Sequence, residues 1–186
     1  MLCKELPKMY TCAIIMRATA KHLNTGFTLI ELLLVVSLIG IMVGFIITVI
    51  NPTLYMKRAR DSRRISDVTA LARAVSFALS GGYIKLQDTT FGCSNCTSIT
   101  GTKDTDGVNG WVKFTTTSSG GLSEFMGDLP EDPINDATYY FEFASDGSKF
   151  ELNTQLEDPQ HYIKITNEGG NDMTRYEVGT SFVLIP

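Results

Sequence analysis

Residues 26–50 read GFTLIELLLVVSLIGIMVGFIITVI, and this stretch decides how the rest of the chain is organised. Its only charged side chain is Glu31, which lies near the start of the apolar run. A run of about 20 or more apolar residues is long enough to cross a hydrocarbon core of roughly 30 Å as one helix. The sequence therefore predicts a membrane-spanning helix that carries one carboxylate.

The position of Glu31 in this helix has two interpretations. An acidic side chain deep in a membrane helix costs roughly 2.5 to 3.5 kcal/mol on translocon scales, and less near an interface. Glu31 either lies at the interface and reaches the headgroups, or it pairs with a cation. Cutting the bond between Gly26 and Phe27 would create such a cation, an ammonium group in the same chain or in a neighbour.

The residues around this bond resemble the signature of the type IV pilin and pseudopilin family. That signature is a glycine before a cleavage site, usually Phe or Met after it, and a glutamate at the fifth mature position of an apolar helix; Gly26, Phe27 and Glu31 match it, and Gly40 is a further family-like glycine. The resemblance implies cleavage after Gly26 and N-methylation of Phe27 by a prepilin peptidase. It also implies an inner-membrane assembly platform and polymerisation into a filament with copies of itself or related subunits.

Four segments are expected. They are a prepilin leader over residues 1–26, a hydrophobic transmembrane or filament-core helix over 27–52, an amphipathic continuation of that helix over 53–82, and a globular β-rich head domain over 83–186. The leader is basic and has no long apolar core of its own. A start at Met16 instead of Met1 would leave a shorter basic leader, and both starts stay open.

The segment after the apolar run has the periodicity of an amphipathic helix. Apolar residues recur at three- and four-residue spacing at Ile65, Val68, Ala72, Val75 and Leu79. Such spacing places them on one face of a helix, and the glycines at 81 and 82 favour its end. The mature chain is thus predicted to open with one long helix, which lies in the membrane over its first half and packs on a domain over its second.

Two glycines and an Asn-Pro pair are weak points in this helix. Glycine lowers helix propensity by about 1 kcal/mol, and proline removes a backbone hydrogen bond. Gly40, Gly44 and the pair Asn51 and Pro52 either permit close helix packing or, as the resemblance implies, mark local melting. Pro52 stands four positions later than the proline that is usual in pilins, so the extent of any unwound stretch is open.

A cluster of basic residues follows the apolar run. It consists of Lys57, Arg58, Arg60, Arg63 and Arg64. These residues are expected to form a solvated collar or to contact anionic headgroups; the alternative is pairing with acidic surface on neighbouring subunits. The positive-inside rule, taken alone, would place the carboxyl domain in the cytoplasm. The motif around Glu31 is more specific than a charge count, so the extracytoplasmic orientation is favoured.

Cys93 and Cys96 are the cysteines that remain in the mature chain, because Cys3 and Cys12 lie in the leader. In an exported domain the pair is expected to form a disulfide that pins a loop. A zinc site would need two further ligands, and His161 is the single histidine of the mature chain. A redox site would usually place the first cysteine at a helix amino terminus, which is not evident here.

The remaining sequence predicts a small antiparallel sheet, and hence an α+β fold. Strands are expected over residues 111–117, 139–144, 149–155, 162–165 and 181–185, with one helical turn over 122–126. Asp146 and Gly147 between two β-rich runs predict a hairpin. Residues 129–133 followed by this hairpin resemble the carboxyl region of pseudopilins. Their calcium loop is not matched, and Asp132 and Asp136 are the possible contributors to a cation site; no cofactor is expected.

These patterns favour a structural protein over an enzyme or a nucleic-acid binder. The sequence shows no constellation of His, Cys and acidic residues for catalysis, and acidic residues dominate beyond Gly81. The predicted function is a subunit of a type IV pilus or a type II secretion-like filament, first held in the inner-membrane lipid and later at the cell surface or in the periplasm. The alternative is a single-pass membrane-anchored binding domain that does not polymerise.

Overall fold

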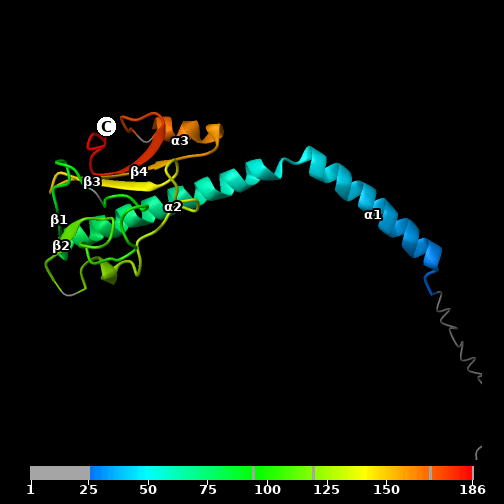
Figure 1. Ribbon diagram of the computed structural model, residues 1–186, viewed down its shortest axis with the longest axis horizontal. Helices are drawn as coiled ribbons and strands as arrows, with labels where there is room; N and C mark the ends of the chain where they lie inside the picture. The colour runs from blue at the N-terminus through cyan, green and yellow to red at the C-terminus, as the bar shows by residue number, and fades with distance from the viewer. Residues whose placement is uncertain (1–25, 94, 119, 168, 186) are drawn as a thin grey trace, which may run out of the picture. The chain divides into compact units, whose positions relative to one another are not determined.

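The computed structural model describes residues 26–93, 95–118, 120–167 and 169–185 (Figure 1). The predicted leader and the alternative start at Met16 therefore lie outside the described residues, apart from Gly26. The chain divides into two compact units, residues 1–48 and 49–186. Helices and small antiparallel sheets in one chain confirm the predicted α+β class with a long apolar helix near the amino terminus.

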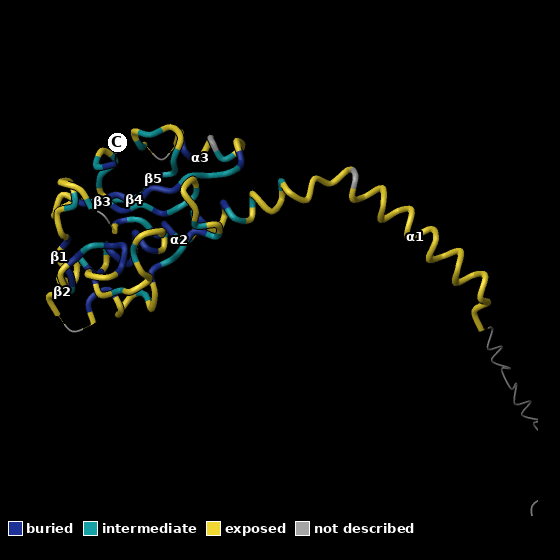
Figure 2. The backbone as a smooth tube through the Cα atoms, in the orientation of Figure 1, coloured by how far each residue is buried: buried dark blue, intermediate teal, exposed yellow. Residues whose placement is uncertain are grey.

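Helix α1, Leu29–Val49, is apolar on every side. All of its described side chains are exposed, and Figure 2 shows the helix as exposed along its length. Residues 29–47 are long and apolar enough to cross a membrane by length and composition. A helix without a polar face is normally covered by lipid or by other helices, so α1 requires a covering that the described residues do not provide.

Helix α2, Pro52–Ser80, begins after a short break in the helical backbone. Asn51 has φ −80° and ψ 94°, which is an extended conformation, and Pro52 occupies the first turn of α2. Proline is well suited to that position because it lacks the N–H group that a helix start leaves unpaired. The one continuous helix expected from the sequence is thus divided at Ile50 and Asn51.

The buried face of α2 follows the predicted stripe and extends it. Val68, Ala72 and Val75 are buried as expected, together with Leu71 and Ala78. Two other members of the stripe, at positions 65 and 79, are only half-buried. The buried face therefore lies slightly to one side of the predicted one.

The carboxyl end of α2 is closed by two backbone hydrogen bonds. The N–H of Gly82 donates to the carbonyl of Leu79 at 3.0 Å, and that of Tyr83 donates to Ala78 at 2.8 Å. Gly82 has φ +70°, a conformation that glycine adopts without strain. The double glycine therefore ends the helix in the predicted place.

The main sheet is antiparallel in the order β3-β4-β5. Its strands are β3 Phe141–Ser145, β4 Phe150–Gln155 and β5 Arg175–Gly179. β3 and β4 form the hairpin predicted around Asp146 and Gly147, and Gly147 has φ +86°. Helix α2 contacts β4 and β5, and buried aromatic side chains of β3 and β4 complete the core between them.

A second sheet pairs β1, Ile84–Leu86, with β2, Phe114–Thr116. β2 covers only the later part of the strand expected over residues 111–117. The buried Trp111 and Phe114 join the core that α2 forms with the main sheet. The predicted turn over 122–126 is a 3-10 helix, η1 Gly121–Glu124.

Both strands predicted in the carboxyl tail are wrong. Residues 162–165 lie in helix α3, Tyr162–Asn167, which follows the 3-10 turn η2, Pro159–His161. Residues 181–185 form no strand, because the N–H groups of Leu184 and Ile185 donate to the Glu151 carboxylate instead of to a neighbouring strand. The third strand is β5, which lies between these two segments.

Candidate functional site

Gly26, Phe27 and Thr28 form a non-helical segment that leads into α1. The hydroxyl of Thr28 accepts a hydrogen bond from the N–H of Glu31 at 3.3 Å, so Thr28 is the amino-terminal cap of the helix. This cap was not predicted. Its signal in the sequence is a threonine and a glutamate three residues apart, a spacing that is typical of a capping box.

The bond between Gly26 and Phe27 is exposed in the chain. The Phe27 side chain is 80% exposed, and no atom lies within 4 Å of the place where a Cβ at residue 26 would stand. The fold of this chain therefore does not require glycine at position 26. A requirement for glycine at position 26 therefore has to come from another molecule that binds this segment.

The carboxylate of Glu31 is exposed and has no hydrogen bond or ion pair with any residue in the described part of the chain. Its place in the first turn of α1 gives it a favourable interaction with the helix dipole, typically about 0.3 to 1 kcal/mol. Burial of an acid in a membrane helix costs up to about 2.5 to 3.5 kcal/mol. The dipole therefore offsets only part of the cost of deep burial, so Glu31 requires either exposure at the membrane interface or a cation partner.

Gly40 and Gly44 resemble Gly26 in their surroundings. No atom lies within 4 Å of a Cβ built at either residue. Both stand inside α1, where glycine costs about 1 kcal/mol relative to alanine. Among the described residues nothing offsets this cost, which favours close packing of α1 against another helix.

Cys93 and Cys96 lie in the loop between β1 and β2 with their sulfur atoms at disulfide distance, 1.92 Å. Cys96 is 4% exposed and belongs to the core. Its carbonyl accepts a hydrogen bond from the N–H of Phe143 in β3 at 2.9 Å. The cysteine pair therefore holds its loop against the edge of the main sheet, as a loop-pinning disulfide would.

The structure corrects both interpretations of the basic cluster at its most buried member, Arg64. This side chain is fully buried. Its guanidinium forms two hydrogen bonds with Asp132, at 2.6 and 3.0 Å, and donates to Asp61 at 2.8 Å and to Glu157 at 2.6 Å. Arg64 thus joins α2 to two segments of its own head domain, and it contacts neither solvent nor a neighbouring subunit.

Asp61, three positions before Arg64 on the same helix, is also fully buried. One carboxylate oxygen accepts from Arg64 and from the N–H of Glu157, at 2.9 Å. The other accepts from the N–H of Asp158 at 2.9 Å and lies 3.0 Å from Nδ1 of His161. Asp61 therefore fixes the turn that follows β4.

Two further arginines of the basic cluster pair with the same turn. Arg60 makes a two-pronged contact with Glu157, at 2.7 and 2.6 Å, and Arg58 donates to Asp158 at 2.6 Å. Arg63 differs, because its side chain is 67% exposed and lies 3.4 Å from Asp67. Arg58, Arg60 and Arg64 are therefore paired with acids from distant segments of their own chain and do not form a free collar. Among the described residues, Arg63 pairs only with Asp67 on its own helix.

The electrostatics of the network agree with this pairing. Burial alone would lower the pKa of Arg64, but its hydrogen bonds to Asp132, Glu157 and Asp61 more than reverse this, so the pKa lies above its ordinary value. The hydrogen bond from Arg60 holds the pKa of Glu157 below its ordinary value, although burial opposes this. Both groups are therefore charged at neutral pH.

The lowered pKa of Glu157 predicts a loss of stability in acid. Because its pKa is lower in the folded than in the unfolded state, the carboxylate stabilises the fold above the ordinary glutamate value of about 4.3. That contribution disappears as the pH falls through the folded value. We expect the difference in urea midpoint between the wild type and Glu157→Gln to be large at pH 7 and to narrow towards pH 3, measured by the fluorescence of Trp111.

The exposed Glu124 provides the control for this titration. Its carboxylate has no hydrogen bond or ion pair within the described residues, so Glu124→Gln should match the wild type at both pH values. A Glu157→Gln midpoint that stays equally far below the wild type throughout the range would contradict the role of the Glu157 charge.

The possible cation ligands have other partners. Asp132 binds Arg64 and also accepts from the N–H of Ile134 at 2.8 Å. Asp136 accepts from the N–H groups of Thr138 and Tyr139, both at 2.8 Å. In the part of the chain that the structure describes, no group of three or more His, Cys, Asp or Glu residues could hold a metal ion.

Comparison with known proteins gives one family match. Residues 21–47 match the model of the prokaryotic N-terminal methylation motif, which is the prepilin motif of type IV pilins and pseudopilins. No curated protein and no solved structure matches the chain. The match covers Gly26, Phe27, Glu31 and most of α1, and it confirms the resemblance noted from these residues.

Proposed function

We propose that this chain, which carries a prepilin-type methylation motif at residues 21–47, is a structural subunit of a type IV pilus or a type II secretion-like filament. A prepilin peptidase cuts after Gly26 and methylates Phe27, and α1 then forms the filament core. The observation that carries the proposal is the unpartnered Glu31 carboxylate in the first turn of an exposed apolar helix, beside an accessible Gly-Phe bond.

Assembly proceeds by charge neutralisation. The ammonium group at Phe27 of an incoming subunit meets the Glu31 carboxylate of one already in the filament. Among packed apolar helices an unpaired charge costs several kcal/mol, so the pair is strongly favoured over either charge alone. Its position sets the axial register between neighbouring subunits, while Gly40 and Gly44 allow their helices to approach closely.

The subunit occupies two places in turn. Helix α1 holds the precursor in the lipid of the inner membrane with the head domain outside the cytoplasm, and an assembly platform in that membrane moves the processed subunit into the filament. Pairing of Arg58, Arg60 and Arg64 with acids of their own head domain leaves Lys57 and Arg63 as the less neutralised charges of the basic cluster. This weakens the charge argument for a cytoplasmic head.

Analysis of the mature amino terminus tests the proposed processing. We expect the protein isolated from membranes to begin at N-methylated Phe27, and a strain without prepilin peptidase to keep the leader. Amino-terminal sequencing and intact mass measure both outcomes. A mature protein that still begins at its initiator methionine in the presence of peptidase would instead support a membrane-anchored binding domain that does not polymerise.

Shearing separates the two kinds of filament. A pilus subunit leaves the cell in long sheared fibres, whereas a secretion pseudopilin stays with the cell envelope. The control is a strain that lacks the assembly platform, in which the processed subunit should remain in the membrane fraction.

A further inference from the structure

Phe91 is the most exposed large apolar side chain in the described part of the chain, at 97%. It lies in residues 87–93, the Phe91 loop, which has contacts on either side of the phenyl ring. The carboxylate of Asp88 accepts hydrogen bonds from the N–H and hydroxyl of Thr90, at 2.9 and 2.6 Å, and the Cys93–Cys96 pair closes the other side. An exposed aromatic side chain on a segment held at both ends is typical of an anchor residue in an interface.

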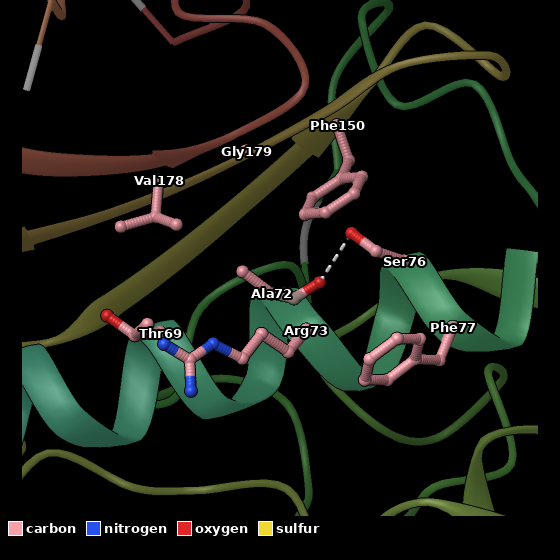
Figure 3. Close-up of a pocket in the computed structure, with 8 residues that line it drawn as sticks. All are labelled: Thr69, Ala72, Arg73, Ser76, Phe77, Phe150, Val178 and Gly179. Atoms are coloured by element: carbon pink, nitrogen blue, oxygen red, sulfur yellow. Dashed lines mark hydrogen bonds between the residues drawn. The ribbon is translucent and has the colours of Figure 1, made fainter.

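A groove of about 330 Å³ lies between α2 and the strands β4 and β5. In Figure 3, Phe150 and Val178 extend towards the helix, and Arg73 and Phe77 lie on the helix side. Phe77 is 62% exposed. The complete lining is Thr69, Ala72, Arg73, Ser76, Phe77, Phe150, Val178 and Gly179.

The Phe91 loop and the groove belong to opposite edges of the three-stranded sheet. The loop lies beside β3: the N–H of Thr89 donates to the carbonyl of Ser145 at 2.8 Å, and the N–H of Phe143 donates to the carbonyl of Cys96 at 2.9 Å. The groove involves β5, the strand at the other edge of the order β3-β4-β5. A contact between two different surfaces of the same protein is heterologous, and repeated without closure it builds a helical filament.

The size and charge of the two surfaces are complementary. A dry cavity of about 150 Å³ holds a benzene ring, so the larger groove has room for the phenyl ring of Phe91. Arg73 at the groove has no hydrogen bond or ion pair with any described residue. Beside the loop, Asp88 and Asp146 are both exposed, and their backbones pair in an isolated β-bridge. Lys149, near Asp146, offsets part of the negative charge of the two side chains.

We propose that the Phe91 loop of one subunit inserts into the α2–β5 groove of a second copy of this chain. The phenyl ring of Phe91 packs against Phe77 and Val178, and Arg73 faces the acidic side of the loop. This contact would join head domains along the filament in addition to the pairing of Phe27 with Glu31. The inference rests on the proposed filament function, because a heterologous contact is productive only in an open polymer.

Site-specific photocrosslinking tests the contact in the full-length protein. The benzophenone amino acid p-benzoylphenylalanine, which retains a phenyl ring, replaces Phe91 in cells that contain the peptidase and the assembly platform. We expect ultraviolet light to produce a covalent dimer, and mass spectrometry to place the crosslink within residues 69–77 or at residues 178 and 179. The same probe at Met173, which is 71% exposed, is the control and should not reach the groove.

The outcomes separate this contact from the filament function itself. Sheared or envelope-bound filaments whose subunits begin at methylated Phe27 would support the filament function. If position 91 in such filaments crosslinks to lipid, to another protein or to another part of the head, the proposed contact alone is overturned. The same holds for methylated filaments without any crosslink. An unprocessed chain that gives no dimer would overturn the contact and the proposed function together.

Substitutions provide a second test that does not depend on the probe. We expect Phe91→Ala to reduce assembled filament by about tenfold, the effect of losing one well-buried aromatic anchor. Because Phe91 is almost fully exposed in the subunit, the head should keep its stability. Met173→Ala is the matched control and should assemble normally; equal assembly of both variants would contradict the proposal.

Arg73 has its own matched control. Arg73→Glu reverses a charge at the groove, and Lys85→Glu makes the same change on the exposed face of β1. We expect only Arg73→Glu to reduce the dimer obtained with the probe at position 91. Equal reduction by both variants would show that total charge, not the groove, controls association.

Discussion

Arg64→Met is expected to lower the free energy of unfolding of the head domain by about 3 to 5 kcal/mol, the cost of removing one partner from a buried ion pair. The substitution keeps much of the side-chain volume but leaves the buried carboxylates of Asp61, Asp132 and Glu157 without their common cation. Typical domains are stable by only about 5 to 15 kcal/mol, so this loss would leave the head marginally folded.

Trp111 is a suitable reporter for this measurement. It is the one tryptophan of the sequence, its side chain is 1% exposed, and its indole N–H donates to the carbonyl of Pro130 at 3.1 Å. Its fluorescence should therefore follow unfolding of the head and remain insensitive to α1. Urea titration of the full-length protein in detergent gives the change in midpoint and slope.

Two further variants separate the network from general effects of charge. Arg63→Met removes an exposed arginine one residue away, and we expect it to stay within about 0.5 kcal/mol of the wild type. Arg64→Lys keeps the charge but cannot reproduce the two-pronged contact with Asp132, so it should restore stability only in part. Equal losses for Arg63→Met and Arg64→Met would contradict the importance of the buried network.

The sequence predicted the parts of this protein that depend on neighbouring residues. The apolar run, the Gly-Phe junction with Glu31, and the hairpin at Asp146 and Gly147 are each specified within a few positions. The end of α2 at the double glycine is equally local. These features require no knowledge of how distant segments pack.

The buried network could not be predicted in the same way. Asp61 and Arg64 continue the buried face of α2 at the three- and four-residue spacing that leads to Val68 and Leu71. Their polar character nevertheless suggested a solvent-facing side. Burial of Arg64 is possible because acids at distant positions neutralise it, with Asp132 separated by 68 residues, and no local pattern identifies such partners.

The conformation of the carboxyl tail could not be predicted from the local sequence either. A run of β-branched, aromatic and aliphatic residues over 182–185 is compatible with a strand, but a strand also needs a partner edge. The Glu151 side chain instead takes the N–H groups of residues 184 and 185. A buried carboxylate near the start of β4 therefore decides the conformation of the tail from more than thirty residues away.

Glu31→Val is expected to remain membrane-inserted and to be cleaved and methylated at Phe27, but to reduce assembled filament by at least about 100-fold. The reason is that the ammonium group of each incoming subunit would remain unpaired among apolar helices, at a cost of several kcal/mol, where each 1.4 kcal/mol corresponds to a factor of ten. Immunoblots of sheared and membrane fractions measure assembly, and intact mass measures processing.

Ser37→Val is the matched control, because it replaces another polar residue of α1 whose hydroxyl bonds only to its own helix, at 2.8 Å to the carbonyl of Leu34. It should assemble normally. Filaments of Glu31→Val at the wild-type level would contradict charge neutralisation.

Co-expression decides which chain supplies the partner of Glu31. A tagged Glu31→Val subunit still carries the ammonium group at Phe27, so wild-type neighbours can accept it through their own Glu31. If the pair forms between chains, the tagged variant should enter wild-type filaments while failing to assemble alone. If the pair forms within one chain, the variant lacks its partner in every setting and should be excluded from wild-type filaments as well.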